Sequence, residues 1–250
     1  MKNGWLLFVL IFFLMGCSSE ESPAITKKDV VSEEPSSKPE LIENETKENN
    51  EQQIEMLLEF NLPSEQVTIN LEEVDILKEY LSGVSDTQQQ ISNMKLTPIN
   101  LQLNETLYLL QFSCYNDNCS YLLLDQNEDG RSFLVSDLSK LLKFSLSEEN
   151  NKLLMIFRRV SIVNETLIQK DNLVVMDIDS WVKLPYSSST GEKFTNNYQT
   201  PILDAIWNED DSITVTVPNV DSPTEENLME WYNSSEKSTK EQLLSIEEIN

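Results

Sequence analysis

The feature that most constrains the fold is a hairpin pattern that recurs in the last part of the chain. The stretches 101–112, 144–157 and 206–217 each contain a short strand, a turn rich in Asn, Glu or Asp, and a longer apolar strand, which is typical of β-hairpins. Further apolar runs follow them, at Ser120–Leu124 with Phe133–Val135, at Leu173–Ile178 with Trp181–Leu184, and at Leu228–Tyr232. We therefore expect a mainly β region at 98–250, built from about three four-stranded antiparallel meanders.

An aromatic residue, an acidic turn and an apolar strand follow one another at Trp207, at 208–211 and at 213–217. This order resembles the blades of bacterial β-propellers of the TolB and dipeptidyl-peptidase N-terminal kind, in which it occurs once per blade. The resemblance covers about the last 150 residues and implies propeller-like blades. Because closed propellers have at least about four blades, three architectures remain open: an open arc, a closure completed by a partner, and a β-sandwich built from meanders.

The segment 51–97 has a helical periodicity instead. Its first apolar stripe is formed by Ile54, Leu57 and Leu58. A second helix is predicted from an N-cap at Asn70 to Gly83, and a third from Asp86, with apolar side chains three to four positions apart in each. Residues 18–50, which precede this helical segment, are rich in Ser, Glu, Lys, Asn and Pro and lack periodicity, so we expect a disordered acidic tether there.

Two capping-box patterns occur near the C-terminus. One begins at Ser222, with Pro223 in the first helical position, and the other begins at Ser238. They predict that the last of the three β units is partly helical.

The N-terminal segment 1–17 has the pattern of an export signal. Lys2 is followed by an apolar run from Trp5 to Met15, which is too short for a bilayer that needs about 20 apolar residues. The sequence Leu14-Met15-Gly16-Cys17 resembles the lipobox of bacterial lipoproteins, although Met15 replaces the usual small residue. The resemblance implies that Cys17 receives a diacylglyceryl group and anchors the chain to the extracytoplasmic face of the cell membrane. The alternative is an uncleaved signal anchor.

The charge and the missing residue types narrow the function classes. The chain carries 43 acidic and 18 basic residues, for a net charge of −25, and it contains no histidine. A field of this sign repels phosphate backbones, so nucleic-acid binding is disfavoured. Without histidine, Ser-His-Asp and Cys-His sites are excluded, and we expect no enzyme. The enzyme class that stays open is a carboxylate-dependent, carbohydrate-active one, because it needs only a pair of acids.

Two cysteines bracket a predicted turn. Cys114 and Cys119 lie on either side of residues 115–118, between two apolar strands. Outside the cytoplasm a disulfide between them is permitted, and we expect one, with two free buried thiols as the alternative. A redox or zinc role is not expected, because the spacing is not C-x-x-C and no further ligand is near.

The turn that follows has the first half of a calcium loop. Asp125, Asn127 and Asp129 alternate before Gly130, as oxygen ligands do in the D-x-[DN]-x-[DN]-G pattern. Ser136 stands where a bidentate Glu is required, so at most a weak calcium or magnesium site is expected. Asn, Asp and Gly are also the ordinary residues of a turn between strands.

These observations favour a membrane-anchored extracytoplasmic lipoprotein that acts as a non-enzymatic binding or assembly module without a cofactor. Its partners would be the membrane, through the lipid anchor, and another envelope protein or an extracellular ligand. The alternatives are the carboxylate-dependent enzyme and a weak divalent-cation-binding module.

Overall fold

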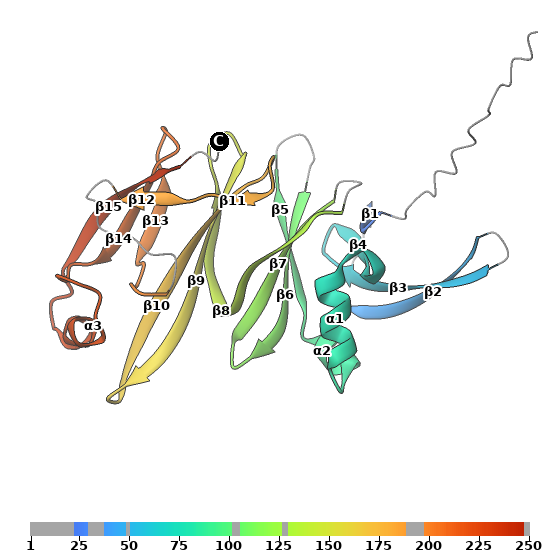
Figure 1. The fold of residues 1–250 in the computed structure, drawn as a ribbon, viewed down its shortest axis with the longest axis horizontal. Helices are drawn as coiled ribbons and strands as arrows, with labels where there is room; N and C mark the ends of the chain where they lie inside the picture. The colour runs from blue at the N-terminus through green and yellow to red at the C-terminus, as the bar shows by residue number, and fades with distance from the viewer. Residues whose placement is uncertain are drawn as a thin grey trace, which may run out of the picture.

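The fold is mainly β, with three antiparallel sheets of four, seven and four strands and a few short helices (Figure 1). The computed structural model describes residues 23–29, 38–48, 51–101, 106–126, 130–188 and 198–247. The predicted signal segment 1–17 lies outside the described residues. Among the described helices, none has the length and apolar composition that crossing a membrane requires.

The seven-stranded sheet is bent at its central strand, so that the molecule has four layers. β8 pairs with β7 through Ser139 and with β9 from Lys140 onward. Register shifts on both sides and a positive φ of 44° at Leu138 accompany the bend. We call the four layers, in chain order, layers 1 to 4.

Layer 1 has the strand order β1-β4-β3-β2, with β1 (Ile25–Asp29), β2 (Glu40–Glu48), β3 (Glu51–Asn61) and β4 (Glu65–Asn70). Layers 2 and 3 form the bent sheet, with β5 (Lys95–Asn100), β6 (Thr106–Tyr115), β7 (Asn118–Asp125), β8 (Ser132–Leu146), β9 (Lys152–Val163), β10 (Thr166–Asp177) and β11 (Val182–Lys183) in sequential order. Layer 4 has the order β12-β15-β14-β13, with β12 (Tyr186–Ser188), β13 (Asp204–Trp207), β14 (Ile213–Pro218) and β15 (Thr239–Ile246).

An apolar core lies between each pair of neighbouring layers, and the inner strands contribute to two cores at once. On β6, Tyr108 and Leu110 pack toward layer 1, whereas Leu107 and Leu109 pack toward layer 3. The same division occurs on β9 and β10, whose side chains alternate between the second and third cores. Because both faces of these strands are buried, their sequences are unbroken apolar runs rather than alternating patterns.

The outer faces of the two end layers are more polar. On β4, Val67 and Ile69 are fully buried while Thr68 is partly exposed. On β14, the inward positions are buried and apolar, and the outward positions are Thr214 and Thr216. On the outer face of layer 4, Thr214 lies between Ile206 and Leu243, which are 50% and 41% exposed, so this face is of mixed polarity.

The predicted tether at 18–50 is wrong where the structure describes it, because β1 and β2 lie within it. β1 pairs with β4, placing Ile25 opposite Ile69, and both Ala24 and Ile25 are buried. A strand this short carries no periodic signal of its own, and its stability comes from the sheet edge on which it pairs.

The first predicted helix is also a strand, β3. Ile54, Leu57 and Leu58 fit a helical stripe, but the structure buries Leu58 and Phe60, which have the two-residue spacing of a strand. The window is too short for periodicity to distinguish the two forms.

The other two predicted helices of this segment are confirmed. Asn70 accepts a hydrogen bond from the backbone N–H of Glu72 and caps a short 3₁₀ turn, η1 (Leu71–Glu73), which leads into α1 (Asp75–Gly83). Asp86 caps α2 (Thr87–Ser92), and Ile91 is fully buried. These helices pack in the core between layers 1 and 2.

The C-terminal capping boxes give one helix and one strand. α3 (Glu225–Asn233) forms, but its N-cap is Thr224 rather than Ser222. The pattern at Ser238 instead precedes β15, whose alternating Gln242 and Leu244 are buried between β12 and β14. Pairing on both sides overrides a local helix-start signal.

Gly130 allows β1 to approach the β7–β8 turn. It has a φ of +55°, and a Cβ added there would lie 2.2 Å from the Cβ of Ala24. A side chain at Gly130 would therefore clash with the residue that leads into β1.

We expect Gly130→Ala to lower the free energy of unfolding by about 1–3 kcal/mol, through overpacking and left-handed strain, as measured by urea denaturation. Gly83→Ala is the matched control, because nothing lies within 4 Å of its added Cβ. Adding Ala24→Gly to the Gly130→Ala chain should restore part of the loss. Equal stability of the Gly130→Ala and wild-type chains would contradict this contact.

Candidate functional site

The predicted disulfide is present. Cys114 on β6 and Cys119 on β7 are bonded across the hairpin. The turn between them contains Asn116 and Asp117, both with positive φ, which is typical of a tight hairpin turn. The pair closes the hairpin between β6 and β7.

Asp125 is engaged with protein groups rather than presented to a cation. It is buried, and its carboxylate accepts hydrogen bonds from Nε of Arg131, at 3.0 Å, and from Nη2 of the same residue. Arg131 also donates to the carbonyl of Asp179 and lies 4.9 Å from the ring centroid of Trp181. Asp125 thus helps to join the β7–β8 turn to the β10–β11 turn.

The other two predicted ligands, Asn127 and Asp129, lie outside the described residues, so the calcium interpretation stays a prediction. Within the part of the chain that the structure describes, no three acidic or cysteine side chains converge as metal ligands would.

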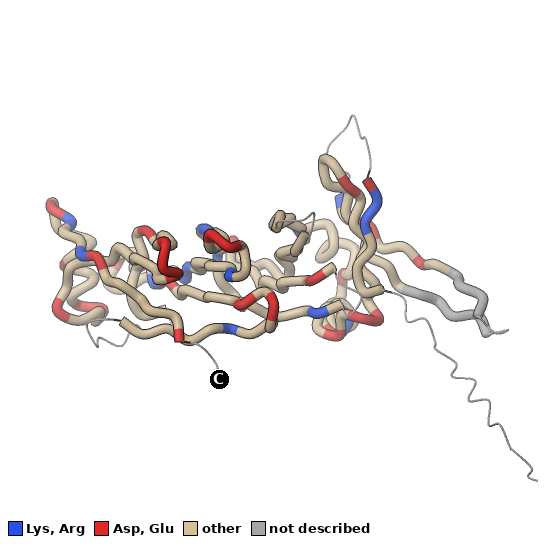
Figure 2. Tube along the Cα trace, turned by 90° about the horizontal axis from the view of Figure 1, so that it is seen from above, with Lys and Arg blue, Asp and Glu red and all other residues tan. Residues whose placement is uncertain are grey.

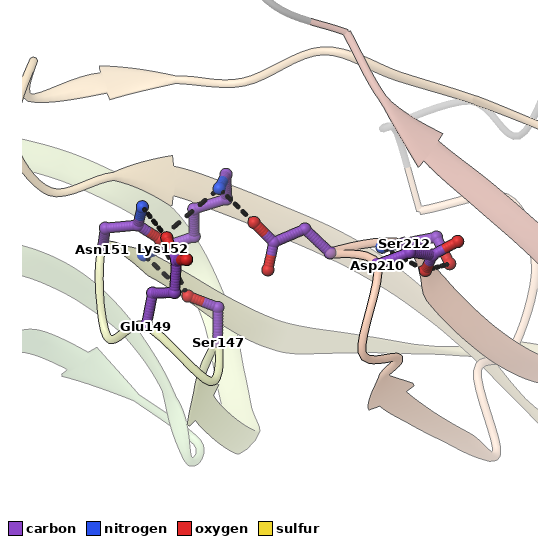
Figure 3. Close-up of polar contacts among 7 residues, drawn as sticks. Ser147, Glu149, Asn151, Lys152, Asp210 and Ser212 are labelled. Carbon is purple, nitrogen blue, oxygen red and sulfur yellow. Dashed lines mark hydrogen bonds and ion pairs between the residues drawn. The ribbon is translucent and has the colours of Figure 1, made fainter.

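A polar cluster joins layers 3 and 4 at the β8–β9 and β13–β14 turns (Figure 3). Nζ of Lys152 donates to Oδ2 of Asp211 at 2.6 Å. Asp210 accepts hydrogen bonds from both the backbone N–H and the hydroxyl of Ser212, which lower its pKa. These carboxylates already have partners that hold the turns in place, so the cluster is structural.

A hollow of about 470 Å³ lies beside the bend of β8, on the face of layer 3 that is directed toward layer 2. We call it the β8–β11 hollow. It is lined by three residues of β8, one residue each of β9, β10 and β11, and one loop residue: Val135, Ser136, Asp137, Arg159, Asn172, Lys183 and Tyr198.

Arg159 holds the bend of β8 at one end of this hollow. Its Nε donates to the carbonyl of Leu138 at 3.1 Å and its Nη2 to the carbonyl of Asp137 at 2.7 Å. Its guanidinium lies 4.1 Å from the ring centroid of Tyr198. Since a guanidinium has five N–H donors, donors remain beyond these two bonds.

A chain of hydroxyl groups forms one wall. The Ser136 hydroxyl lies 2.7 Å from that of Ser139 and 2.8 Å from that of Tyr198. Each hydroxyl can donate or accept, so the chain can adjust to a ligand. Asp137 lies at the exposed rim, where one of its carboxylate oxygens accepts a hydrogen bond from the Ser120 hydroxyl.

Two polar groups in the hollow lack the partners that their burial calls for. Lys183 is partly buried, its pKa is lowered by desolvation, and it makes no ion pair with any described residue. Asn172 is 7% exposed, and its Oδ1 has no hydrogen-bond partner within the described structure. Unpaired buried polar groups cost free energy, which singles out this hollow as the candidate site.

The sequence gives little sign of this hollow, because its residues are scattered and belong to no motif. The one available signal is that polar pairs interrupt the apolar runs of β9 and β10, at Arg158-Arg159 and Asp171-Asn172. Which of these side chains face the same cavity depends on strand register.

Among the described residues that line the hollow, Asp137 is the only carboxylic acid, whereas the carboxylate-dependent glycosidases need two acids facing each other across the substrate. Arg159 and Lys183 provide positive charge instead.

Comparison of the chain with protein-family models, with curated protein sequences and with solved structures gave no match.

Proposed function

We propose that the protein is a lipid-anchored lipoprotein of the extracytoplasmic membrane face, and that it acts as a non-enzymatic binding module. The lipobox-like sequence that ends at Cys17 supports the anchor. The observation that carries the binding function is the β8–β11 hollow, which holds two cationic side chains in a chain of net charge −25.

The four layers support an open arc of propeller-like units as the architecture of the module. Each layer is antiparallel and packs on its neighbour, as successive blades do. In layers 1 and 4 three strands form a meander and the first strand of the layer pairs with the last one, β1 with β4 and β12 with β15. A partner that closed a ring would have to bury the polar positions of the outer faces, such as Thr68, Thr214 and Thr216, at a cost in free energy.

The distribution of charge supports a protein or small-molecule partner rather than a nucleic acid. Asp and Glu occur along the whole described part of the chain (Figure 2), and a negative field of this kind repels a phosphate backbone.

Chemical crosslinking of intact cells, followed by capture of the tagged chain, tests this proposal. We expect discrete crosslinked species with the wild-type chain, and their loss when Cys17→Ala releases the chain from the membrane. A wild-type chain that yields only uncrosslinked monomer would argue against an assembly role. Hydrolysis of a carbohydrate by the purified chain would favour the carboxylate-dependent enzyme instead.

A further inference from the structure

We infer that the β8–β11 hollow binds a small monoanionic carboxylate that carries hydroxyl groups, such as a hydroxy acid or a sugar acid. This inference rests on the proposed binding function and names the ligand class of the same site.

The positive charge of the hollow calls for an anion. Arg159 is held in place by the carbonyls of Asp137 and Leu138, so its guanidinium is already oriented. Lys183 has no counter-ion among the described residues, although it is partly buried. An anion between them would form charge-assisted hydrogen bonds and would offset the cost of burying the ammonium group.

The other groups of the hollow favour a hydroxylated monoanion over phosphate. The guanidinium of Arg159, the ammonium of Lys183 and the carboxylate of Asp137, which lies at the rim and is bonded to Ser120, together carry a net charge near +1, which a single negative charge balances. The carboxylate of Asp137 would oppose the second charge of a phosphate dianion. The hydroxyl chain that joins Ser136 and Tyr198 supplies further donors and acceptors for sugar-like hydroxyl groups.

The size of the hollow favours a small molecule. Its volume of about 470 Å³ falls in the lower half of the range for small-molecule pockets, about 300–1,000 Å³.

Calorimetric titration of the detergent-solubilised full-length protein tests the inference with lactate, gluconate and galacturonate as probes. Galactose supplies hydroxyls without charge, acetate supplies charge without hydroxyls, and phosphate supplies a different anion. We expect at least one hydroxy-carboxylate to bind about tenfold more tightly than each of these three comparison compounds. No binding of the three probes, or phosphate binding as tightly as the best of them, would overturn the inference.

Lys183→Met is the decisive variant, because it removes the unpaired charge and keeps a side chain of similar length. It should weaken binding of the best probe about tenfold or more, without lowering the melting temperature, since the buried charge destabilises the unliganded protein. Lys140→Met is the matched control, because Lys140 pairs with Asp117 at the exposed surface and does not line the hollow. Equal affinity in the two variants would refute a role for Lys183.

The crosslinking experiment reports separately on the proposed function. A chain that forms its crosslinked species but binds none of the probes would overturn the ligand class alone.

Discussion

Asp171→Ala should lower the free energy of unfolding by about 3–5 kcal/mol, because it removes one partner of a buried ion pair. The Asp171 side chain is fully buried on β10. Its carboxylate accepts hydrogen bonds from Nε of Arg158, at 2.7 Å, and from Nη2 of the same residue, at 2.8 Å. The same carboxylate accepts the backbone N–H of Ile202 at 2.7 Å. The substitution would leave a guanidinium and an amide unpaired at the junction of layers 3 and 4.

Asp171 also connects the two layers through its backbone, whose N–H donates to the carbonyl of Thr200. Residues 200–202 lead into the β13–β14 hairpin of layer 4, and Ile202 is buried in the core between layers 3 and 4. Loss of the carboxylate should therefore loosen layer 4 preferentially. Compared with the wild-type chain, the Asp171→Ala chain should show a larger increase in amide hydrogen exchange in β13 and β14 than in β6 and β7.

The matched control is Asp204→Ala, which removes the partner of Lys143 in an exposed pair of 2.9 Å. Exposed pairs contribute about 0.2–1 kcal/mol, so urea denaturation should show a much smaller effect than for Asp171→Ala. The hydrogen bond from Lys143 lowers the pKa of Asp204, so this small contribution should be present at neutral pH and lost as the pH falls through the lowered value. Equal losses in the two variants would mean that burial does not decide the strength of the Asp171 pair.

The sequence predicts the strands of layers 2 and 3 well, because a strand that is buried on both faces has an unbroken run of apolar residues. The runs at 120–124 and 173–178 lie almost entirely in β7 and β10, where neighbouring side chains enter different cores. Such runs have too few polar positions to be surface helices, and their length fits strands. The disulfide between Cys114 and Cys119 could be predicted for the same reason, because the two apolar runs on either side of the turn indicate a hairpin.

Layer 1 could not be predicted in this way, because its strands depend on each other. β1 has little apolar content, and it is held by pairing with β4 and by the contact of Ala24 with Gly130. The sequence therefore did not predict layer 1, and about three units were expected where the structure has four layers. The composition of this segment is typical of disorder, but β1 forms because the edge of β4 is available for pairing and because Ala24 and Ile25 become buried there.

The candidate site depends on a bend that local sequence does not encode. Leu138 has no turn-forming side chain, yet it adopts a positive φ and directs β8 from one layer to the next. Arg159 stabilises this bend from a different strand. The hollow is thus a consequence of long-range strand register. The calcium-loop pattern at Asp125 is a local sequence signal, and in the structure the Asp125 carboxylate is paired with Arg131.

Cys17→Ala should move the protein from the membrane fraction to the soluble fraction, or leave it as an uncleaved precursor. Cys17 is the anchor that the lipobox-like sequence predicts, and stable attachment requires about two or more acyl chains. The acidic charge of the chain offers no electrostatic attraction to anionic lipids that could replace them. Fractionation with immunoblotting measures the change, and mass spectrometry of the mature N-terminus should detect the lipid on the wild-type chain only.

The matched control is the double variant Cys114→Ala with Cys119→Ala, which removes the chain's other two cysteines and its disulfide but keeps the lipidation site. It should remain in the membrane fraction, because the anchor does not depend on the fold of layer 2. A Cys17→Ala chain that is processed to the mature length and still fully membrane-bound would contradict the lipoprotein assignment. Attachment would then have to come from a surface of the folded protein, and the apolar tip of the β9–β10 hairpin would be the first place to test, since Ile162 is 74% and Leu167 59% exposed there.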